Sequence, residues 1–272
     1  MKKVSILIPV FNSAERLSRT LSSIYAHSES DNLIPVVVDN CSTVDLKSIL
    51  DRFPRAKYYR NDSNLGRVGN WNKCLQYIDG DFYMFLMAGD ELNEKSDIVS
   101  NLGDSQTLTV FDMLYVQGEV ERRWRKWGNK CYGVHQSEKI LARYLLKGTM
   151  PWGPLQTWVF PRSALGEFNK NDPSHADIYY ICDIILRFPK VKLVDEASIR
   201  WISYPERFHN SIDIWESKVK DLNFTKKVLC RLDNGKLFFI SKACFFALSF
   251  WQFRNVRFKG IIKFWHYLIF RI

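Results

Sequence analysis

The sequence predicts an α/β fold with a mostly parallel central sheet flanked by helices. Three observations predict it. Short apolar runs rich in β-branched and aromatic residues recur through residues 1–100. Segments with helical spacing of apolar residues separate these runs. Polar residues follow directly after them, at the positions where ligands bind in parallel sheets. Such alternation of strand and helix implies helices on both faces of the sheet.

The first expected strand is residues 4–10, a continuous apolar run typical of a strand buried on both faces. A helix follows, because Leu17, Leu21 and Ile24 form one apolar face at helical spacing. The same reasoning places strands at residues 34–38, 57–60 and 82–87, separated by helices around residues 46–53 and 68–78.

Three polar residues stand just beyond these strands. Asn12, Asp39 and Asp90 each follow an apolar run. Asn and Asp also favour ordinary turns, so each residue taken alone has that simpler interpretation. Because the carboxyl ends of parallel strands meet at one edge of a sheet, the three together predict a shared ligand site.

The net charge of +10 is distributed unevenly along the 272 residues. Residues 1–100 carry 12 basic and 13 acidic side chains, so the basic excess lies in the remainder. Such an excess is compatible with phosphate-bearing ligands, nucleic acid or an anionic membrane. No nucleic-acid-binding motif accompanies it, and we expect no nucleic-acid partner.

The C-terminal segment differs from the rest in composition. No acidic residue follows Asp233, and basic residues there alternate with Phe and Trp. Its longest uncharged run, residues 243–253, is far shorter than the roughly 20 residues needed to span a bilayer. This pattern predicts helices that lie on an anionic membrane surface; helices packed on the core or at a dimer interface are the alternative.

The cysteines and the N-terminus indicate the compartment. The six cysteines are scattered without metal-ligand spacing, as expected for reduced thiols. The initial apolar run ends at Asn12 without a small-residue cleavage site, which favours a strand over a signal peptide. We therefore expect a cytoplasmic protein, peripheral on the inner face of the cytoplasmic membrane.

Four blocks of sequence occur in order: SILIPVFN, VVVDNCSTVD, NDSNLGRVGNWNKCL and YMFLMAGDEL. In order and spacing they resemble the N-terminal half of family 2 glycosyltransferases with the GT-A fold, of the bacterial polysaccharide and O-antigen type. The similarity covers residues 3–95 closely and residues 150–211 loosely. It implies a GT-A domain over residues 1–212, with a nucleotide-sugar half (1–100) and an acceptor half (101–212), and a helical extension over residues 213–272.

The resemblance implies a set of residues that bind the donor nucleotide. In the family, residues matching Pro9, Phe11 and Asn12 shape the nucleotide pocket, and the residue matching Asp39 accepts a hydrogen bond from the base. A carboxylate is a sensible partner for a uracil N–H. Where family members often have a second Asp, this chain has Asn40. The third block matches the family segment that lies over the nucleotide sugar. It supplies three more implied donor-binding residues, Gly66, Arg67 and Asn70.

The fourth block departs from the family pattern at the metal site. The family motif LDADD places two carboxylates where this chain has Met87 and Gly89, so only Asp90 and then Glu91 remain. Neither Met nor Gly offers a hard oxygen side-chain ligand. The resemblance implies Mg²⁺ or Mn²⁺ held by Asp90, the donor diphosphate and waters. The alternative is that a cationic side chain neutralises the diphosphate.

The resemblance also implies a catalytic base in the second half. An inverting transfer needs a carboxylate that deprotonates the acceptor hydroxyl. The family places it on a helix with a pattern such as ADYDLWLR, whose start matches Asp177. Asp183 is the competitor, and stabilisation of the helix N-terminus is the structural alternative for Asp177.

Three further residues complete the implied site. Trp152 and Trp158 fall in the segment that resembles the acceptor floor and could stack on a sugar, although core packing is equally compatible with them. His209 matches a late loop of the family in which a His contacts the metal or the diphosphate. A purely structural role is the alternative for this residue. The basic stretch at residues 122–127 is by default a solvated loop; gripping the phosphates of a lipid-linked acceptor is the functional alternative.

The resemblance implies an inverting hexosyl- or N-acetylhexosaminyltransferase. Its expected donor is a UDP-sugar and its expected acceptor a polyprenyl-diphosphate-linked saccharide, as in lipopolysaccharide or other surface polysaccharide synthesis. The alternative is a catalytically impaired protein that binds nucleotide-sugars or membranes and has lost the metal-binding carboxylates.

Overall fold

The computed structural model describes residues 2–124, 132–137, 140, 154–171, 173 and 176–204. Apart from Ile140, these residues belong to one compact unit formed by Met1–Ser137 and Trp152–Pro205; Glu138–Pro151 and Glu206–Ile272 form the second. The predicted extension over residues 213–272 lies outside the described residues, as do Trp152 and His209.

The first hundred residues follow the predicted alternation of strand and helix. Strands β1 and β3 have the expected bounds, whereas β4 ends two residues earlier than expected. In order, the elements are β1 (Val4–Val10), α1 (Ala14–Ala26), the 3-10 turn η1 (Ser30–Asn32), β2 (Leu33–Asp39), α2 (Lys47–Leu50), β3 (Lys57–Arg60), α3 (Gly66–Leu75), β4 (Phe82–Phe85) and β5 (Glu91–Leu92).

The second part of the compact unit contributes more strand than helix. Its elements are β6 (Thr107–Gln117), β7 (Val120–Trp124), β8 (Gly133–Gln136), η2 (Leu155–Thr157), β9 (Trp158–Pro161), η3 (Arg162–Ala164), α5 (Ala176–Arg187) and β10 (Lys190–Ile202). Helix α5 has Asp177 in its first turn and Arg187 in its last, which complements the helix dipole at both ends.

The strands of the described residues form one sheet with the order β3-β2-β1-β4-β9-β6-β10-β5, with β7 beside β6 and β8 beside β10. Pairing is parallel from β3 to β4 and again between β6 and β10. The remaining pairs are antiparallel. The predicted α/β fold is confirmed, with parallel pairing from β3 to β4. In the second part the sheet is mixed, because β9 enters between β4 and β6 in the opposite direction.

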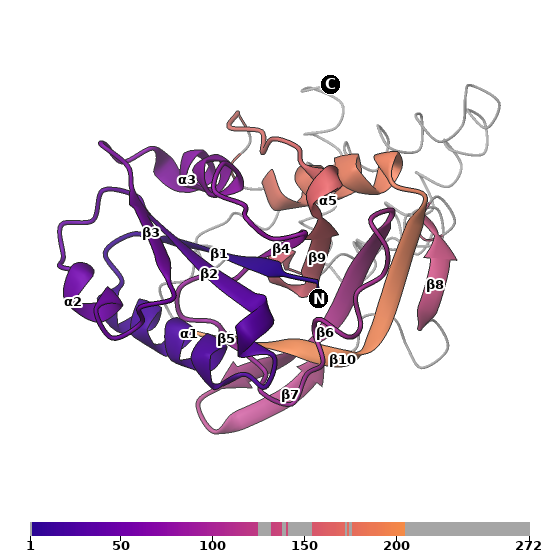
Figure 1. The fold of residues 1–272 in the computed structure, drawn as a ribbon, viewed down its shortest axis with the longest axis horizontal. Helices are drawn as coiled ribbons and strands as arrows, with labels where there is room; N and C mark the ends of the chain where they lie inside the picture. Colours follow the sequence, from indigo (N-terminus) through magenta and orange to yellow (C-terminus); the bar gives the residue numbers. More distant parts are fainter. Residues whose placement is uncertain are drawn as a thin grey trace, which may run out of the picture. The chain divides into compact units, whose positions relative to one another are not determined.

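Helices cover both faces of the parallel part. Figure 1 shows α1 and α2 on one face and α3 and α5 on the other. The first face is mainly aliphatic, with Leu17, Leu21 and Ile24 of α1 fully buried against β1. The second face is aromatic and includes Phe168, whose ring stacks on that of Tyr180 in α5 at 3.9 Å between centroids. Burial on both faces explains why β1 is a continuous apolar run.

Trp158 belongs to this aromatic core. Its side chain is 0% exposed, and its ring stacks on that of Phe160 at 5.9 Å between centroids. The prediction that Trp158 stacks on an acceptor sugar is therefore wrong, because β9 lies between β4 and β6 and all four of its residues are buried. The core-packing alternative is the one observed.

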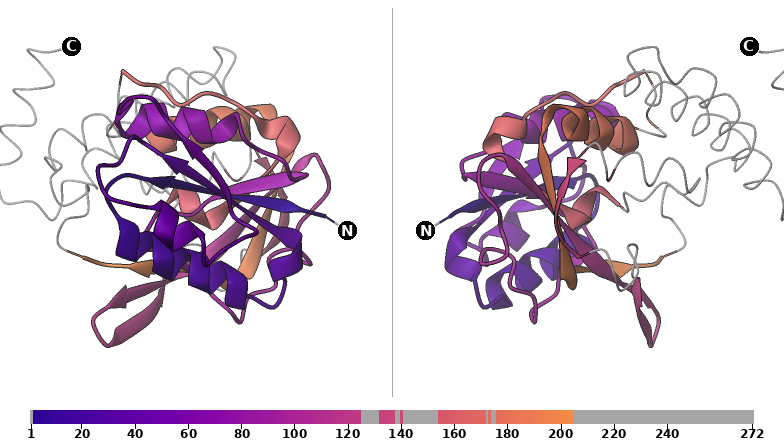
Figure 2. Two further views of the ribbon diagram at one scale, coloured as in Figure 1. Left: turned by 60° about the vertical axis from the view of Figure 1, so that its left-hand side comes forward. Right: turned by 90° about the vertical axis from the view of Figure 1, so that its right-hand side faces the viewer.

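The β6–β7 hairpin projects from the sheet on the side away from the N-terminus, as the left view of Figure 2 shows. Its strands pair from Met113↔Trp124 to Gln117↔Val120. Trp124 is 51% exposed on this hairpin. In the part of the chain that is described, no helix has the length and apolar character that crossing a bilayer would require.

Replacing the buried Trp158 by alanine should lower the free energy of unfolding by about 3–5 kcal/mol, because it leaves a large cavity in the aromatic core. The exposed Trp124→Ala is the matched control and should change the value by about 0.5 kcal/mol or less. Urea unfolding of both variants measures the difference. Equal effects of the two substitutions would contradict the core position of Trp158.

Candidate functional site

The ends of β1, β2 and β4 lie together at one edge of the sheet, because the three strands run parallel. Val10 is opposite Asp39 in the β1–β2 register, and Leu7 is opposite Phe85 in the β1–β4 register. Just beyond β4, the Leu86 N–H still donates to the Leu7 carbonyl at 2.9 Å. The predicted convergence of the segments that follow these strands is confirmed.

Asn12 joins the first two of these segments. Its backbone lies in the left-handed region (φ 49°), which Asn tolerates better than most residues. Its N–H donates to the Ser42 hydroxyl at 2.9 Å, and its side-chain oxygen accepts from the Thr43 N–H at 2.7 Å. Phe11, 44% exposed, and the partly buried Pro9 flank it at the surface of this edge.

Asp39 lies at the end of β2 with a fully buried carboxylate. One oxygen accepts from the Ser42 N–H at 2.8 Å. The other accepts from the Tyr58 hydroxyl at 2.9 Å and from the Arg60 guanidinium. A nucleotide base that used this carboxylate would have to share it with Arg60 or displace that side chain, which is 45% exposed.

Tyr58 and Arg60 were not anticipated as site residues. Both lie on β3, two positions apart and therefore on one face, and Arg60 is directly opposite Asp39 in the register. Burial, and after it the neighbouring Asp39 carboxylate, raises the pKa of Tyr58, so its hydroxyl remains a donor at neutral pH. The alternation along β3 could have revealed the pair, but only once the register with β2 was known.

A network of Asn side chains holds the loop between β3 and α3. The Asn40 oxygen accepts from the Leu65 N–H at 2.9 Å and from the Asn61 amide at 3.1 Å. Its NH₂ group donates to the Asn64 oxygen at 2.7 Å. Because a carboxylate could accept but not donate here, an amide suits position 40 better than the Asp often found in the family.

Asn70 is part of the same network rather than of an open surface. It is 3% exposed; its oxygen accepts from the Asn61 amide at 2.9 Å, and its NH₂ donates to the Val38 carbonyl at 3.0 Å. These contacts tie the start of α3 to the end of β2. In this structure Asn70 positions the predicted donor loop, and its predicted contact with the nucleotide stays a prediction.

The first turns of α3 and α5 bring two predicted residues together. Gly66 adopts φ 71°, a conformation that favours glycine, at the start of α3. The next residue, Arg67, lies over the Trp71 ring at 4.7 Å and donates to the Pro173 carbonyl. Burial lowers the pKa of Arg67, and the nearby Asp177 carboxylate opposes that shift. The side chains of Arg67 and Asp177 are therefore electrostatic neighbours.

The second carboxylate of α5 has a different environment. The Asp183 side chain is 57% exposed and forms an ion pair with Arg187 at 3.4 Å, four residues along the helix. Six residues separate it from Asp177, so the two carboxylates point in directions roughly 120° apart around the helix axis. Of the two candidates for the base, Asp177 is the one with an electrostatic link to the predicted donor loop.

Asp90 is fully buried, and both of its side-chain oxygens accept hydrogen bonds from other residues of the chain. One oxygen accepts from the Gln156 amide at 2.9 Å and the other from the Ile202 N–H at 3.1 Å. Its carbonyl accepts from the Thr20 hydroxyl at 2.7 Å. Asp90 therefore fixes the segment after β4 to α1, η2 and the end of β10, contacts that sequence reasoning did not anticipate.

These residues do not form an evident site for a hard divalent cation. Both oxygens of Asp90 already accept hydrogen bonds, and Met87 and Gly89 lack oxygen side-chain ligands. Within the described ranges, no three His, Cys, Asp or Glu side chains are grouped to hold a metal. Mg²⁺ or Mn²⁺ held by Asp90 stays a prediction.

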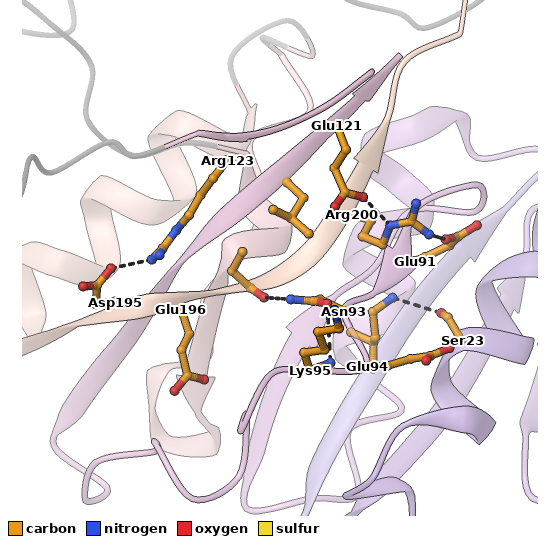
Figure 3. Close-up of a pocket in the computed structure, with 13 residues that line it drawn as sticks. Ser23, Glu91, Asn93, Glu94, Lys95, Glu121, Arg123, Asp195, Glu196 and Arg200 are labelled. Atoms are coloured by element: carbon orange, nitrogen blue, oxygen red, sulfur yellow. Dashed lines mark hydrogen bonds and ion pairs between the residues drawn. The ribbon is translucent and has the colours of Figure 1, made fainter. Parts of the chain in front are cut away.

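A separate cavity of about 560 Å³ lies between α1, β5, β7 and β10. Figure 3 shows its charged lining, with Arg123 paired to Asp195 at 2.5 Å and Arg200 bridging Glu91 and Glu121 at 2.7 and 2.9 Å. None of the predicted site residues lines it. Neither Asp39 nor Arg67 lines it, so the cavity is distinct from the edge that carries these two residues.

The fold is that of GT-A glycosyltransferases. S. aureus TarS 1–349 in complex with UDP-GlcNAc superposes with a TM-score of 0.70 at 16% identity, covering 95% of this chain and 74% of that one. The Pyrobaculum calidifontis mannosyltransferase PcManGT, in complex with GDP-Man and Mn²⁺, gives 0.57 at 14% identity, covering 96% and 78%. At sequence identities of 14–16%, these similarities establish the fold only. Family membership is established by comparing the sequence with a family profile.

The profile of glycosyl transferase family 2 matches residues 5–166, and the chain belongs to this family. A curated relative, the GalNAc(5)-diNAcBac-PP-undecaprenol beta-1,3-glucosyltransferase of Campylobacter jejuni, is 34% identical over 97 residues. That match spans 34% of this chain and 31% of the relative, so the chain covers about a third of that protein's length.

Removing the Asn40 side chain should destabilise the loop that carries Gly66 and Arg67. Asn40→Ala leaves the Leu65 N–H and the Asn61 amide without their acceptor, at a cost of about 1–3 kcal/mol in the free energy of unfolding. Urea unfolding of this variant beside Asn171→Ala, an exposed position, measures the effect. If the two variants were equally stable, the amide network would not be holding the loop.

Proposed function

We propose that this chain transfers a sugar from a UDP-linked donor, with inversion, to a saccharide carried on a polyprenyl diphosphate. The observation that carries the proposal is the position of Arg67 at the start of α3: it donates to the Pro173 carbonyl in the segment before α5, and the Asp177 carboxylate of α5 affects its pKa. This arrangement combines a cation suited to a diphosphate with a carboxylate suited to an acceptor hydroxyl.

The donor half of the mechanism uses the loops at this edge. The uracil N–H hydrogen-bonds to the Asp39 carboxylate beside Phe11, and Asn12 and Pro9 form the wall of the nucleotide pocket. Arg60 leaves the outer oxygen of Asp39 as the base arrives. TarS has been determined with UDP-GlcNAc and with UDP, which supports a uridine nucleotide for this chain.

The transfer itself requires one base. Asp177 takes the proton of the acceptor hydroxyl while that oxygen forms a bond to the anomeric carbon. The bond from that carbon to the β-phosphate oxygen breaks on the opposite side, and UDP leaves with the electron pair. Arg67 stabilises the negative charge that develops on the diphosphate. An α-linked donor therefore gives a β-linked product.

The acceptor is proposed to be lipid-linked and the protein to work at the cytoplasmic face of the membrane. The name of the Campylobacter jejuni relative specifies an undecaprenyl-diphosphate-linked acceptor. The basic and aromatic sequence after Asp233 suits an anionic membrane surface. Such attachment would hold the enzyme next to an acceptor that cannot leave the membrane, as in the assembly of surface polysaccharides.

A second candidate is a nucleotide-sugar-binding protein without turnover. The observation that favours it is the replacement of both expected metal-binding carboxylates by Met87 and Gly89. Thermal shift with a panel of nucleotides and nucleotide-sugars, followed by transfer and hydrolysis assays, separates the candidates. Binding of UDP with no turnover for any donor supports the second candidate. No stabilisation by any nucleotide contradicts both.

Asp177→Asn should lower the rate of transfer by about 10²–10⁴-fold, because the amide cannot accept the acceptor proton. UDP affinity should change little, since the substitution keeps the size of the side chain. Asp183→Asn is the matched variant on the same helix and should keep most of the activity, because Asp183 is exposed and paired with Arg187. A loss of activity in Asp183→Asn, with an active Asp177→Asn, would assign the base to Asp183.

A further inference from the structure

We infer that Arg16 neutralises the donor diphosphate in place of a divalent cation, so that UDP binds to this chain without metal. The inference rests on the proposed function, because it concerns the same donor. It starts from the segment after β4, where the two carboxylates implied by the family resemblance are replaced by Met87 and Gly89. The structure places a cationic side chain against the second of these positions.

Arg16 lies in the first turn of α1, just after the end of β1. A β-carbon at position 89 would lie 3.4 and 3.5 Å from the Cδ and Cγ atoms of Arg16. The arginine stem therefore lies beside the place where the side chain of residue 89 would begin. The side chain of Arg16 therefore lies beside Gly89, the position at which the family pattern has a carboxylate.

Tyr204 holds the guanidinium in this position. The Arg16 guanidinium carbon is 3.9 Å from the centroid of the Tyr204 ring, the geometry of a cation–π contact. The Tyr204 hydroxyl in turn donates to the Ala88 carbonyl at 3.5 Å. Arg16, Tyr204 and the segment 88–89 thus form one cluster at the edge where β1 and β4 end.

The same cluster disfavours a carboxylate at position 89. Gly89 has φ 105°, a conformation that residues with side chains rarely adopt. A β-carbon there would also lie only 3.3 Å from the Tyr204 ring. Since Asp90 uses both oxygens on Gln156 and Ile202, the described residues around this segment supply no set of hard ligands for a divalent ion.

A guanidinium can take over the electrostatic part of the metal's role. It is permanently charged and presents planar N–H donors that match phosphate oxygens. The N-terminus of α1, a helix of 13 residues, adds a favourable dipole for an anion near Arg16. Arg16 and Arg67 together provide two cations for a diphosphate at this edge of the sheet.

Calorimetric titration of the full chain with UDP and with uridine, in EDTA and in Mn²⁺, tests the inference. We expect the wild-type affinity for UDP to be the same within about threefold in the two conditions. Arg16→Gln removes the charge but keeps most of the stem, and it should weaken UDP binding at least about tenfold while leaving uridine binding unchanged. Arg16→Lys should recover part of the affinity.

Arg19→Ala is the matched control, because Arg19 lies on the same helix with a side chain 49% exposed and faces Glu15 at 4.0 Å. It should bind UDP as the wild type does. UDP binding that is lost in EDTA and restored by Mn²⁺, or that is unchanged in Arg16→Gln, overturns the inference and leaves the proposed function intact. No binding of UDP in either condition overturns both.

Discussion

The parallel hydrogen bonding of β1 between β2 and β4 is the constraint on which the rest of the structure depends. It directs the three strand ends to one edge, so that the segments carrying Asn12, Asp39 and Asp90 meet there although they are distant in sequence. The pairing is stable because β1 is covered by α1 on one face and by α3 on the other (Figure 1). Strand β6 runs in the same direction as β4, since each pairs antiparallel with β9.

Buried polar contacts convert that edge into a defined site. Asp39, Asn40 and Asp90 are almost fully buried. Their side-chain oxygens accept hydrogen bonds from the Ser42 N–H, the Leu65 N–H and the Gln156 amide, respectively. Burying such groups is favourable only when their hydrogen bonds are made, so each contact restricts the loop to one arrangement. Arg67, next to this network, donates to the Pro173 carbonyl and so links the start of α3 to the segment before α5.

Local pattern was sufficient for the elements whose pairing partners did not need to be known. The strand β1 follows from its apolar run. The helix that carries Asp177 in its first turn follows from family resemblance and from charges that suit the helix dipole. Contacts that depend on register could not be anticipated. Arg60 reaches Asp39 only because β3 pairs with β2 in one particular alignment, and Trp158 is buried because β9 inserts between β4 and β6. A single sequence contains no direct record of either alignment.

The central claim is that a uridine nucleotide binds at the edge where β1, β2 and β4 end, and hydrogen exchange with and without UDP tests it most directly. The account predicts slower amide exchange in residues 10–13, 39–43, 61–70 and 86–90 when UDP is present. Slower exchange confined to residues 91–95 and 195–200, which line the charged cavity, would contradict it, as would no change anywhere in the chain.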